Sequence, residues 1–537
     1  MKLKTFLLSL GLALSLSASA QSAQNEAVVA VISLNDFHGA FVQAEDQGIP
    51  GAPSVLQTID SLRAAYPHNL VVSAGDNFGG SYFYNTTKGQ VMPLFLNECG
   101  IRISAVGNHE FDDGLDELGK KWASSPLRPK GWDIKYLCSN VYDQNGRVPD
   151  IFEPFTVEEV ALSPTKKVRV ALVSMLASSA KEQISSRRTK GMRFSGEYRA
   201  VLDSVAALPA FEAVRNAEIR ALLLHIGSKS KADGTPMWYD KSAGELSAIT
   251  GPLYQAFLTG HSHDPVCGTI NADNKPIVQG WWHGNYINVM KFYVDTLTMA
   301  VTRVEPEIVR TPIRPYASLT PKARRLQDVI DSLLVNTKTA AGVPIGTKLT
   351  YATRAMEHDR MDKFRISEIG TMLCTSYAQA YRNTYPTRDK DIVLGVSHFG
   401  GVRSGISQGE VTVLNVGEVL PFQNNLNGFR VSGKQLKALV DFGYHNPYGY
   451  MQRSNLEPVL DADNHVKKLY YISPNGKRRK IKNRSKCVIV ADDFMSNGGD
   501  GFSTDFFPKE NKSADLPLGA TDAFIKYLQS LDQIPVE

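Results

Sequence analysis

The segment that decides the fold is residues 31–39, with the sequence VISLNDFHG. Its first four positions are apolar or small, and an apolar run that ends at Asn, Asp or Gly is typical of a buried strand. Asp36 and His38 follow it, two residues apart. At the extended end of a strand, such a pair points to the same side. The segment therefore predicts a strand with a chelating Asp and His at its carboxyl end.

Four later segments have the same construction, an apolar run followed at once by Asp, Asn or His. They are residues 71–77 (VVSAGDN), 105–112 (AVGNHEFD), 222–227 (LLLHIG) and 257–264 (FLTGHSHD). In an α/β sheet the ligand crevice lies beyond the carboxyl ends of the strands. The five segments are therefore expected to bring carboxylate, amide and imidazole groups to one place. Such a mixed set of oxygen and nitrogen ligands suits two adjacent divalent transition metals.

Short runs rich in Val, Ile and Leu alternate with amphipathic stretches between about residues 27 and 309, such as the helical pattern over 54–65. Buried strands are expected over residues 28–34, 70–73, 103–106, 168–173, 219–224 and 254–258. This alternation predicts an α/β sandwich. A helix is predicted over residues 321–335, with Thr320 as N-cap and Pro321 at its first position. It joins the sandwich to a second domain that begins near Gly342.

The first twenty residues have the pattern of a cleaved secretory signal. Lys2 and Lys4 precede an apolar run over residues 6–16, and Ala18-Ser19-Ala20 is a typical cleavage site. The alternative is a membrane anchor, but the apolar run is short for a span and no basic flank follows it. The mature chain is therefore expected to be secreted without a membrane anchor. In a Gram-negative source it would be periplasmic, and otherwise extracellular.

The composition is that of an ordinary globular protein, with 43% hydrophobic and 21% charged residues and a formal net charge of +5. So small a net charge does not argue for binding a nucleic acid polymer. Residues 477–486 are strongly basic and follow the turn Pro474-Asn475-Gly476, and they are expected to form a solvated hairpin in preference to a polyanion site. The five cysteines lack CxxC spacing, and most are expected to be small buried hydrophobes, with their pairing left open.

The ordered motifs Asp-x-His, Gly-Asp, Gly-Asn-His-Glu, His and Gly-His-x-His resemble those of the calcineurin-like metallophosphoesterases. The segments NDFHG at 35–39 and GNHEFD at 107–112 are similar, more narrowly, to the 5′-nucleotidase family. The resemblance implies an α/β fold in which a four-layer αββα sandwich precedes a separate α+β substrate-binding domain. The implied organisation is a signal peptide over 1–20, a metallophosphoesterase domain over 25–315, a linker helix over 316–341 and a substrate-binding domain over 342–537.

The resemblance also implies roles for the residues of the five segments. One metal would be held by Asp36, His38 and His263, and the other by Asn108, His225 and His261. Asp76 would bridge the two ions, which could be Zn, Mn, Fe or Co. His109 would be the catalytic histidine that is not a ligand, and Asp112 would orient it; the alternative for Asp112 is a helix N-cap.

Three segments of the C-terminal half resemble the substrate-binding domain of that family: HFGGVR at 398–403, PFQNN at 421–425 and DFMSNGGDGF at 493–502. The implied substrate-binding residues are Arg365, Arg403, Phe422, Asn424, Phe494 and Asp500. In this assignment the two Phe rings sandwich the base, Asp500 accepts hydrogen bonds from the ribose, and the two Arg bind phosphate. Two positions depart from the family pattern, His398 and Asp492, where Asn is usual.

The function implied is a secreted phosphomonoesterase with two metal ions that converts nucleoside 5′-monophosphates to nucleoside and phosphate. Alternatives within the same chemistry are a 2′,3′-cyclic-nucleotide phosphodiesterase with 3′-nucleotidase activity and a UDP-sugar hydrolase. An alternative from another class is a secreted nucleotide-binding protein that has lost catalysis. The sequence leaves the preferred nucleotide, the metal and the oligomeric state open.

Overall fold

The chain is described here from a computed structural model that covers residues 25–123, 131, 133–184, 188–231, 235–237, 242–270, 275–340, 342–388, 390–422 and 424–535. The predicted signal peptide, residues 1–20, lies outside these ranges. The chain divides into two compact units. The first comprises residues up to Gly80 and Thr87–Ile330, and the second comprises Ser81–Thr86 and residues from Asp331 onward.

The first unit is built on two large β-sheets. The seven-stranded sheet has the order β17 (Val301–Arg310), β16 (Tyr286–Asp295), β1 (Glu26–Leu34), β2 (His68–Ser73), β3 (Ile103–Ala105), β4 (Lys135–Leu137) and β6 (Phe152–Glu153). The six-stranded sheet has the order β14 (Val266–Ile270), β15 (Lys275–Gln279), β13 (Ala256–Leu258), β10 (Ile219–Leu223), β8 (Lys167–Val173) and β7 (Phe155–Ala161).

The strands that carry the predicted ligands run parallel within each sheet. β1 pairs with β2 and β2 with β3, and in the other sheet β10 pairs with both β8 and β13. Parallel strands end at a common edge, so the loops that follow them are neighbours. The expected strands are all present, although the one predicted from residue 254 begins at Ala256.

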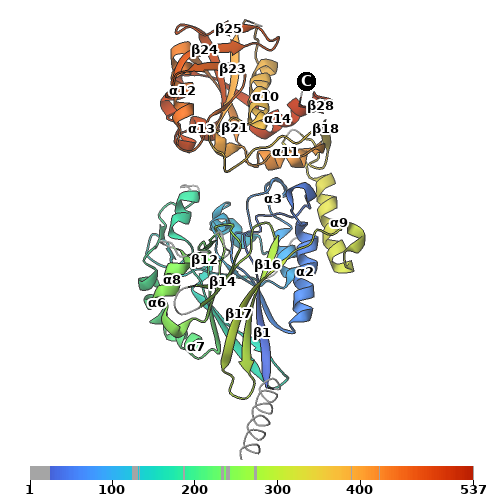
Figure 1. Cartoon of the computed structure of the whole chain (residues 1–537), viewed down its shortest axis with the longest axis vertical. Coiled ribbons are helices and arrows are strands. Elements are labelled where there is room, and N and C mark those ends of the chain that lie inside the picture. Colours follow the sequence, from blue (N-terminus) through green and yellow to red (C-terminus); the bar gives the residue numbers. More distant parts are fainter. Residues whose placement is uncertain are drawn as a thin grey trace, which may run out of the picture. The chain divides into compact units, whose positions relative to one another are not determined.

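The two sheets share one apolar core. Val31 on β1 and Leu172 on β8 are fully buried and belong to the same cluster of side chains, although they come from different sheets. In Figure 1, α2 (Gly51–Ala65) lies on one side of the pair of sheets, and α6 (Tyr198–Ala206), α7 (Glu212–Arg215) and α8 (Ala243–Ile249) lie on the other. The predicted αββα sandwich is therefore confirmed.

Short elements complete the first unit. They are α4 (Met92–Cys99), α5 (Leu115–Lys120), the pair β5 (Val141–Tyr142) and β9 (Arg193–Phe194), and the pair β11 (Lys229–Ser230) and β12 (Pro236–Met237). α3 (Tyr82–Thr87) falls almost wholly in the segment assigned to the second unit.

The second unit has a mixed five-stranded sheet with the order β22 (Gln452–Arg453), β19 (Ile392–Ser397), β26 (Lys486–Asp492), β21 (Asn425–Ser432) and β27 (Lys512–Gly519). Two three-stranded sheets accompany it: β20 (Gly409–Thr412), β18 (Lys348–Ala352) and β28 (Gln533–Ile534), and β23 (Leu456–Leu460), β24 (Val466–Ile472) and β25 (Arg478–Lys480). Its helices are α10 (Glu368–Thr384), α11 (Val413–Val419), α12 (Gly433–His445), α13 (Asp493–Ser496) and α14 (Ala520–Gln529). This is the α+β organisation that was predicted.

The predicted connecting helix is α9 (Pro321–Asn336), and the boundary between the two units falls within it. Thr320 caps it as expected, since its hydroxyl accepts a hydrogen bond from the amide of Ala323 at 3.3 Å. Four of the five cysteines are buried, and all five have free thiols. Among the described helices, none combines the length and the apolar character needed to cross a membrane.

Candidate functional site

The loops after β1 and β2 are held together by main-chain hydrogen bonds. The amides of Asp36, His38 and Gly39 donate to the carbonyls of Gly75, Asp76 and Asn77 at 3.1, 3.0 and 3.0 Å. Each loop thus continues the pairing of the parallel strands beyond their ends. As a result, the three predicted ligands of these loops are fixed relative to one another by the backbone.

The loops of the second sheet attach to the same place. The amide of His261, after β13, lies 3.0 Å from both carboxylate oxygens of Asp36. His225 follows β10, and its Nδ1 lies 2.8 Å from the carbonyl oxygen of Ala74. That carbonyl can only accept, so Nδ1 carries a proton and Nε2 is the ring nitrogen that faces the site. His225 therefore presents Nε2 as a potential metal ligand.

The side-chain donors converge in two adjoining groups. In the first, Nε2 of His38 lies 2.9 Å from Nε2 of His263, which is 3.5 Å from Oδ1 of Asp36. In the second, Nε2 of His225 lies 3.1 Å from Oδ2 of Asp76. Asp76 also lies 3.8 Å from Nε2 of His38, so it stands between the two groups.

Asn108 completes the second group, because its Oδ1 lies 3.2 Å from Nδ1 of His261. The structure therefore brings together all seven residues predicted as ligands: Asp36, His38, Asp76, Asn108, His225, His261 and His263. Their division into two groups corresponds to the two predicted metal positions, with Asp76 at the junction.

The electrostatics of the site fit a bound cation. Asp36 and Asp76 are 0% and 1% exposed, and among the described residues no Lys or Arg forms an ion pair with either. Burial lowers the pKa of His225, but the carboxylates of Asp76 and Asp36 outweigh it and raise the pKa to about 10. Buried carboxylates are normally paired or metal-bound. In addition, Nδ1 of His38 is buried without a hydrogen-bond partner.

The backbone of the site is strained. Asp36, His38, Asp76, His261 and His263 have positive φ angles of 48°, 50°, 51°, 88° and 54°. Non-glycine residues seldom adopt this left-handed conformation, and such strain concentrates at functional sites. Five of the seven predicted ligands share it, which indicates that the loops are shaped to aim these side chains.

His109 forms the expected pair with Asp112, with Nδ1 and Oδ2 separated by 2.8 Å. Burial lowers the pKa of His109, but Asp76 and Asp112 raise it to about 9. The main-chain amide of His109 also donates to Oδ1 of Asp76 at 2.9 Å. Gly79, with φ at 71°, covers the pair so closely that a Cβ there would lie 2.6 Å from both partners. Only glycine fits this position.

Glu110 has a structural role that the motif alone did not reveal. Its two carboxylate oxygens accept hydrogen bonds from the amides of Asp76, Asn77 and Gly107, and from the side chain of Asn77, at 2.6 to 3.1 Å. The residue is 2% exposed. Glu110 therefore fastens the Asp76 loop to the loop that carries Asn108 and His109.

Trp282 and His283 are further neighbours of the site that the sequence did not indicate. The Trp282 ring stacks on His263 with centroids 5.1 Å apart and on His283 with centroids 4.2 Å apart. The amide of His283 donates to the carbonyl of Asp36 at 2.8 Å. Asn35 holds the same loop, since its Nδ2 donates to the carbonyl of Trp281 at 2.9 Å. Trp282 thus supports the imidazole of His263 from a fixed loop.

In the second unit, a chain of contacts joins four of the predicted substrate-binding residues. Arg403 lies over the ring of Phe422 at 5.7 Å and donates to the carbonyl of Gly400 at 3.3 Å. A Cβ on Gly400 would lie 2.5 Å from Oδ2 of Asp500, so the loop and this carboxylate are in close contact. Asp500 has a positive φ of 47°. This side of the unit therefore gathers a cation, a carboxylate and an exposed aromatic ring.

His398 connects Asp500 to the second aromatic residue. Its Nδ1 lies 2.6 Å from Oδ2 of Asp500, and its ring is 4.7 Å from the ring of Phe494. Phe422 and Phe494 are 41% and 45% exposed, unusual for phenylalanine and consistent with rings that bind a ligand. The departure at Asp492 has a structural explanation, because its carboxylate caps α13 by accepting from the amide of Met495 at 2.8 Å.

Two predicted residues are not joined to this group. Among the described contacts, none links the side chains of Arg365 or Asn424 to it, and Arg365 is exposed. Arg360 is instead the arginine near Arg403, since it donates to the carbonyls of Gly400 and Val402 at 3.4 and 3.1 Å. Arg360 and Arg365 stand in the same short stretch, and only the backbone decides which one turns inward.

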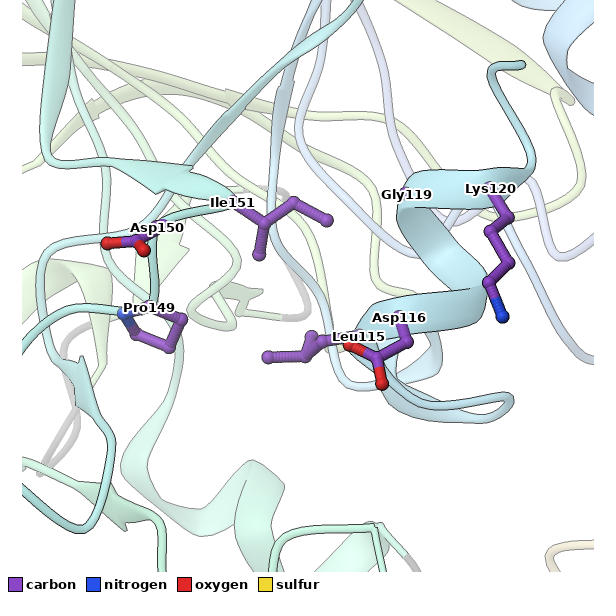
Figure 2. A pocket seen from close by; sticks show the side chains of 7 residues that line it. All are labelled: Leu115, Asp116, Gly119, Lys120, Pro149, Asp150 and Ile151. Carbon is purple, nitrogen blue, oxygen red and sulfur yellow. The ribbon is translucent and has the colours of Figure 1, made fainter. Parts of the chain in front are cut away.

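The first unit also has a hollow of about 580 Å³. Figure 2 shows Leu115 and Gly119 of α5 on one side and Ile151, just before β6, on the other. None of the predicted ligands lines this hollow, and its walls are mostly aliphatic. It is therefore not part of the candidate site.

Replacing Glu110 tests whether this carboxylate holds the metal loops together. Glu110→Ala leaves three buried main-chain amides without an acceptor, whereas Nδ2 of Asn77 keeps Ser104, so we expect the free energy of unfolding to fall by about 3 kcal/mol. The measurement is urea denaturation of both proteins. The control is Glu117→Ala, which removes an exposed carboxylate paired with Lys120 and should leave the stability nearly unchanged. Equal stability of the two variants would refute this role.

Replacing Trp282 tests its support of His263. Trp282→Ala should raise the dissociation constant for Mn²⁺ at one of the sites by about tenfold, because neighbours that orient a ligand contribute this much to metal affinity. The measurement is isothermal titration of metal-stripped protein. Trp281→Ala is the matched control, since this adjacent ring has a similar exposure of 44% against 37% and no stacking contact with His263. Equal weakening in both variants would contradict the assignment.

Comparisons with known proteins agree with the fold and the site. The sequence model of calcineurin-like phosphoesterases matches residues 30–172, and that of the 5′-nucleotidase C-terminal domain matches residues 345–506. A 5′-nucleotidase of Bos taurus is 22% identical over 546 residues, which cover 93% of this chain and 88% of that protein. Endonuclease YhcR of Bacillus subtilis (strain 168) is 23% identical over 441 residues, and the match covers 78% of this chain but 33% of that protein.

Among solved structures, a 5′-nucleotidase precursor from Thermus thermophilus has the same fold. It aligns with a TM-score of 0.66 and 20% sequence identity, and the alignment covers 95% of this chain and 98% of that one. The two domain matches occur in the same order as the two units of the structure. The first matched domain carries the loops with the candidate metal ligands. The chain therefore belongs to the 5′-nucleotidase family of metal-dependent phosphoester hydrolases, with a calcineurin-like phosphoesterase domain followed by a 5′-nucleotidase C-terminal domain.

Proposed function

We propose that this protein hydrolyses nucleoside 5′-monophosphates to nucleoside and phosphate, using two divalent metal ions. The observation that carries the proposal is the convergence of seven donor residues in two adjoining groups, with the His109–Asp112 pair beside them. Relatives with a 5′-nucleotidase name span most of the chain, which supports a nucleotide as the substrate.

The residues present fit two ions that share Asp76. Asp36, His38 and His263 would hold one ion, and Asn108, His225 and His261 would hold the other. Two such ions lower the pKa of a shared water and neutralise the charge on phosphoryl oxygens. The donor set of carboxylate, amide and imidazole is compatible with Zn, Mn, Fe or Co.

His109 supplies the proton chemistry in this proposal. Asp112 accepts a hydrogen bond from Nδ1–H of His109, so the ring is held in one orientation with Nε2 on the opposite side. In the metal-free protein, Asp76 and Asp112 raise the pKa of His109 to about 9 against the effect of burial, and the contact with Asp112 favours the protonated ring. A charged imidazole can donate to the phosphoryl group and protonate the leaving oxygen of the nucleoside.

The second unit supplies the nucleoside-binding groups. The exposed rings of Phe422 and Phe494 would stack on the base, which every nucleobase permits because each has a flat face. Asp500 would accept hydrogen bonds from the ribose hydroxyls, and Arg403 would bind phosphate, with Arg365 and Asn424 as further candidates. His398 already occupies one oxygen of Asp500, so it fixes how that carboxylate meets the sugar.

We extend the proposal to the place where the reaction occurs. The signal pattern of residues 1–20 supports export, which would place the enzyme in the periplasm or outside the cell. A nucleotidase there would act on nucleotides that have left or never entered the cytoplasm. The oligomeric state does not enter the proposal.

The deciding experiment measures phosphate release from AMP by the purified mature protein, before and after chelation and with Mn²⁺ or Zn²⁺ added back. We expect release that disappears on chelation and returns with metal. Activity on a 2′,3′-cyclic nucleotide or a UDP-sugar without activity on AMP would keep the metal centre and replace the substrate. Inactivity of the metal-loaded protein on all three would favour a binding protein.

Removing the His109 imidazole tests its role in proton transfer. His109→Ala should lower kcat for AMP by about 10²- to 10⁴-fold, the usual contribution of a general acid or base. Its metal content, measured by mass spectrometry, should stay the same because His109 is not among the ligands. A variant that keeps normal turnover, or one that loses its metal, would refute the role.

Removing the Asp500 carboxylate tests the ribose contact. Asp500→Ala should raise KM for AMP by about tenfold or more with a smaller change in kcat, because a charge-assisted hydrogen bond is lost. Asp505→Ala, an exposed carboxylate in the following turn, serves as the control. We expect the control to match the unmodified protein in both constants, and an equal rise in KM would contradict the ribose contact.

A further inference from the structure

The positive charge of this chain is concentrated in one short segment. The 23 residues from Asn464 to Lys486 contain nine Lys and Arg and no Asp or Glu. Removing these nine from the chain's 59 basic residues leaves 50, against 54 acidic residues. The remainder of the protein is therefore slightly acidic, and the small net charge of the whole chain conceals a strongly basic segment.

The fold places this segment mainly on one small sheet. β24 and β25 contribute most of it, and Tyr470, Tyr471 and Ile472 of β24 pair with Lys480, Arg479 and Arg478 of β25. In Figure 1, β23, β24 and β25 lie together in the second unit. Leu469 and Tyr471 are buried in the apolar core of that unit. Because side chains alternate along a strand, Lys468, Tyr470, Arg478 and Lys480 share the opposite face.

The basic groups are accessible and mostly without an acidic partner. Eight of the nine side chains are exposed, and Arg479 is partly buried. Among the described residues, Arg478 is the one of the nine that forms an ion pair, with Glu457 at 2.8 Å. Lys434 of α12 adds to the same region, because its amide donates to the carbonyl of Asn483 at 3.0 Å.

Such a concentration of like charge disfavours the folded state. Lysines and arginines on neighbouring strands repel one another, and salt or a bound anion relieves the repulsion. Nine basic residues stand here against one acid on the strands of the same sheet, Glu457, which lies opposite Tyr470 and is paired with Arg478. The surface is therefore suited to a partner with many regularly spaced negative charges.

An aromatic residue on the same face narrows the class of partner. The guanidinium of Arg478 lies over the ring of Tyr470 at 3.4 Å. Aromatic rings and guanidinium planes interleaved with lysines are the pattern that binds single-stranded nucleic acid, whose bases stack while its phosphates meet the cations. A membrane surface would instead call for exposed apolar side chains among the basic ones. Among the described residues of this sheet, Val459 alone is a large exposed apolar side chain, so the face does not have the apolar character that membrane binding requires.

We propose that the sheet β23–β24–β25 binds single-stranded nucleic acid through its basic outer face. Lys468 and Lys480 contact phosphates in this arrangement, and the stacked pair of Tyr470 and Arg478 contacts a base. Binding is sequence-tolerant, since every contact is to phosphate or to the flat face of a base. The inference is independent of the hydrolytic activity, because none of these residues belongs to the metal centre or to the nucleoside-binding group.

The test is fluorescence anisotropy of a labelled oligothymidylate with the purified protein, at salt concentrations between about 50 and 200 mM. A gel confirms that the oligonucleotide stays intact. Lys468→Gln combined with Lys480→Gln should weaken binding by about tenfold. The slope of log affinity against log salt should also fall by about 1.4, since each phosphate contact to a single strand contributes about 0.7.

The matched control combines Lys509→Gln with Lys526→Gln, which removes two exposed lysines of the same unit outside the basic segment. It changes the net charge equally and should bind like the unmodified protein. Equal weakening in both double variants, or no binding by the unmodified protein, would overturn the proposal. Binding to vesicles that contain phosphatidylglycerol but not to the oligonucleotide would overturn it in favour of a membrane. Urea denaturation with the same midpoint in both double variants and the unmodified protein excludes unfolding as the cause of weaker binding.

Discussion

The buried carboxylates of Asp36 and Asp76 are the feature on which the metal centre depends. Asp36 accepts the amide of His261 from the second sheet, while its own amide is held by the loop after β2. Asp76 accepts the amide of His109 and lies against Nε2 of His225. Each carboxylate thus contacts loops of both sheets. The same two groups that attract a cation also hold the edges of the sandwich in register.

This arrangement has an energetic cost that the surrounding structure must offset. A left-handed backbone conformation costs of order 1 kcal/mol or more per non-glycine residue, and five of the predicted ligands adopt it. The hydrogen bonds of Glu110 and Asn35 hold the neighbouring loops, so these segments cannot relax into an easier conformation. The apolar core between the sheets provides the stability on which this local strain rests.

Much of the fold and the site was predictable because it depends on local pattern. Apolar runs that end in Asp, Asn or His predict strands with polar side chains at their ends, so these strands could be located from the sequence. The resemblance to a known family then singled out the seven candidate donors, which the structure brings together. The supporting residues could not. Glu110 acts through amides of a loop more than thirty positions away, and Trp282 is recognised only when its ring is seen against His263.

The second unit shows a similar division. The aromatic and acidic residues of its Gly-rich segments were indicated by motif, and the structure connects Phe422, Arg403, Asp500 and Phe494 through shared neighbours. The choice between Arg360 and Arg365 was not indicated, because side chains five positions apart in an irregular segment point wherever the backbone directs them. The basic composition of residues 464–486 can be read from the sequence. The arrangement of cations around an aromatic ring cannot, because it depends on the strand pairing that places Lys480 beside Tyr470.

The hydrogen bonds that shape the metal loops bear on the order in which the protein folds and binds metal. Backbone amides, Glu110 and Asn35 position these loops through groups that belong to the chain itself. None of these contacts involves a metal ion, so the chain itself supports the conformation that aims the donor side chains. A centre built in this way would accept its ions after folding, so the ion that occupies it would be set by the supply around the finished protein.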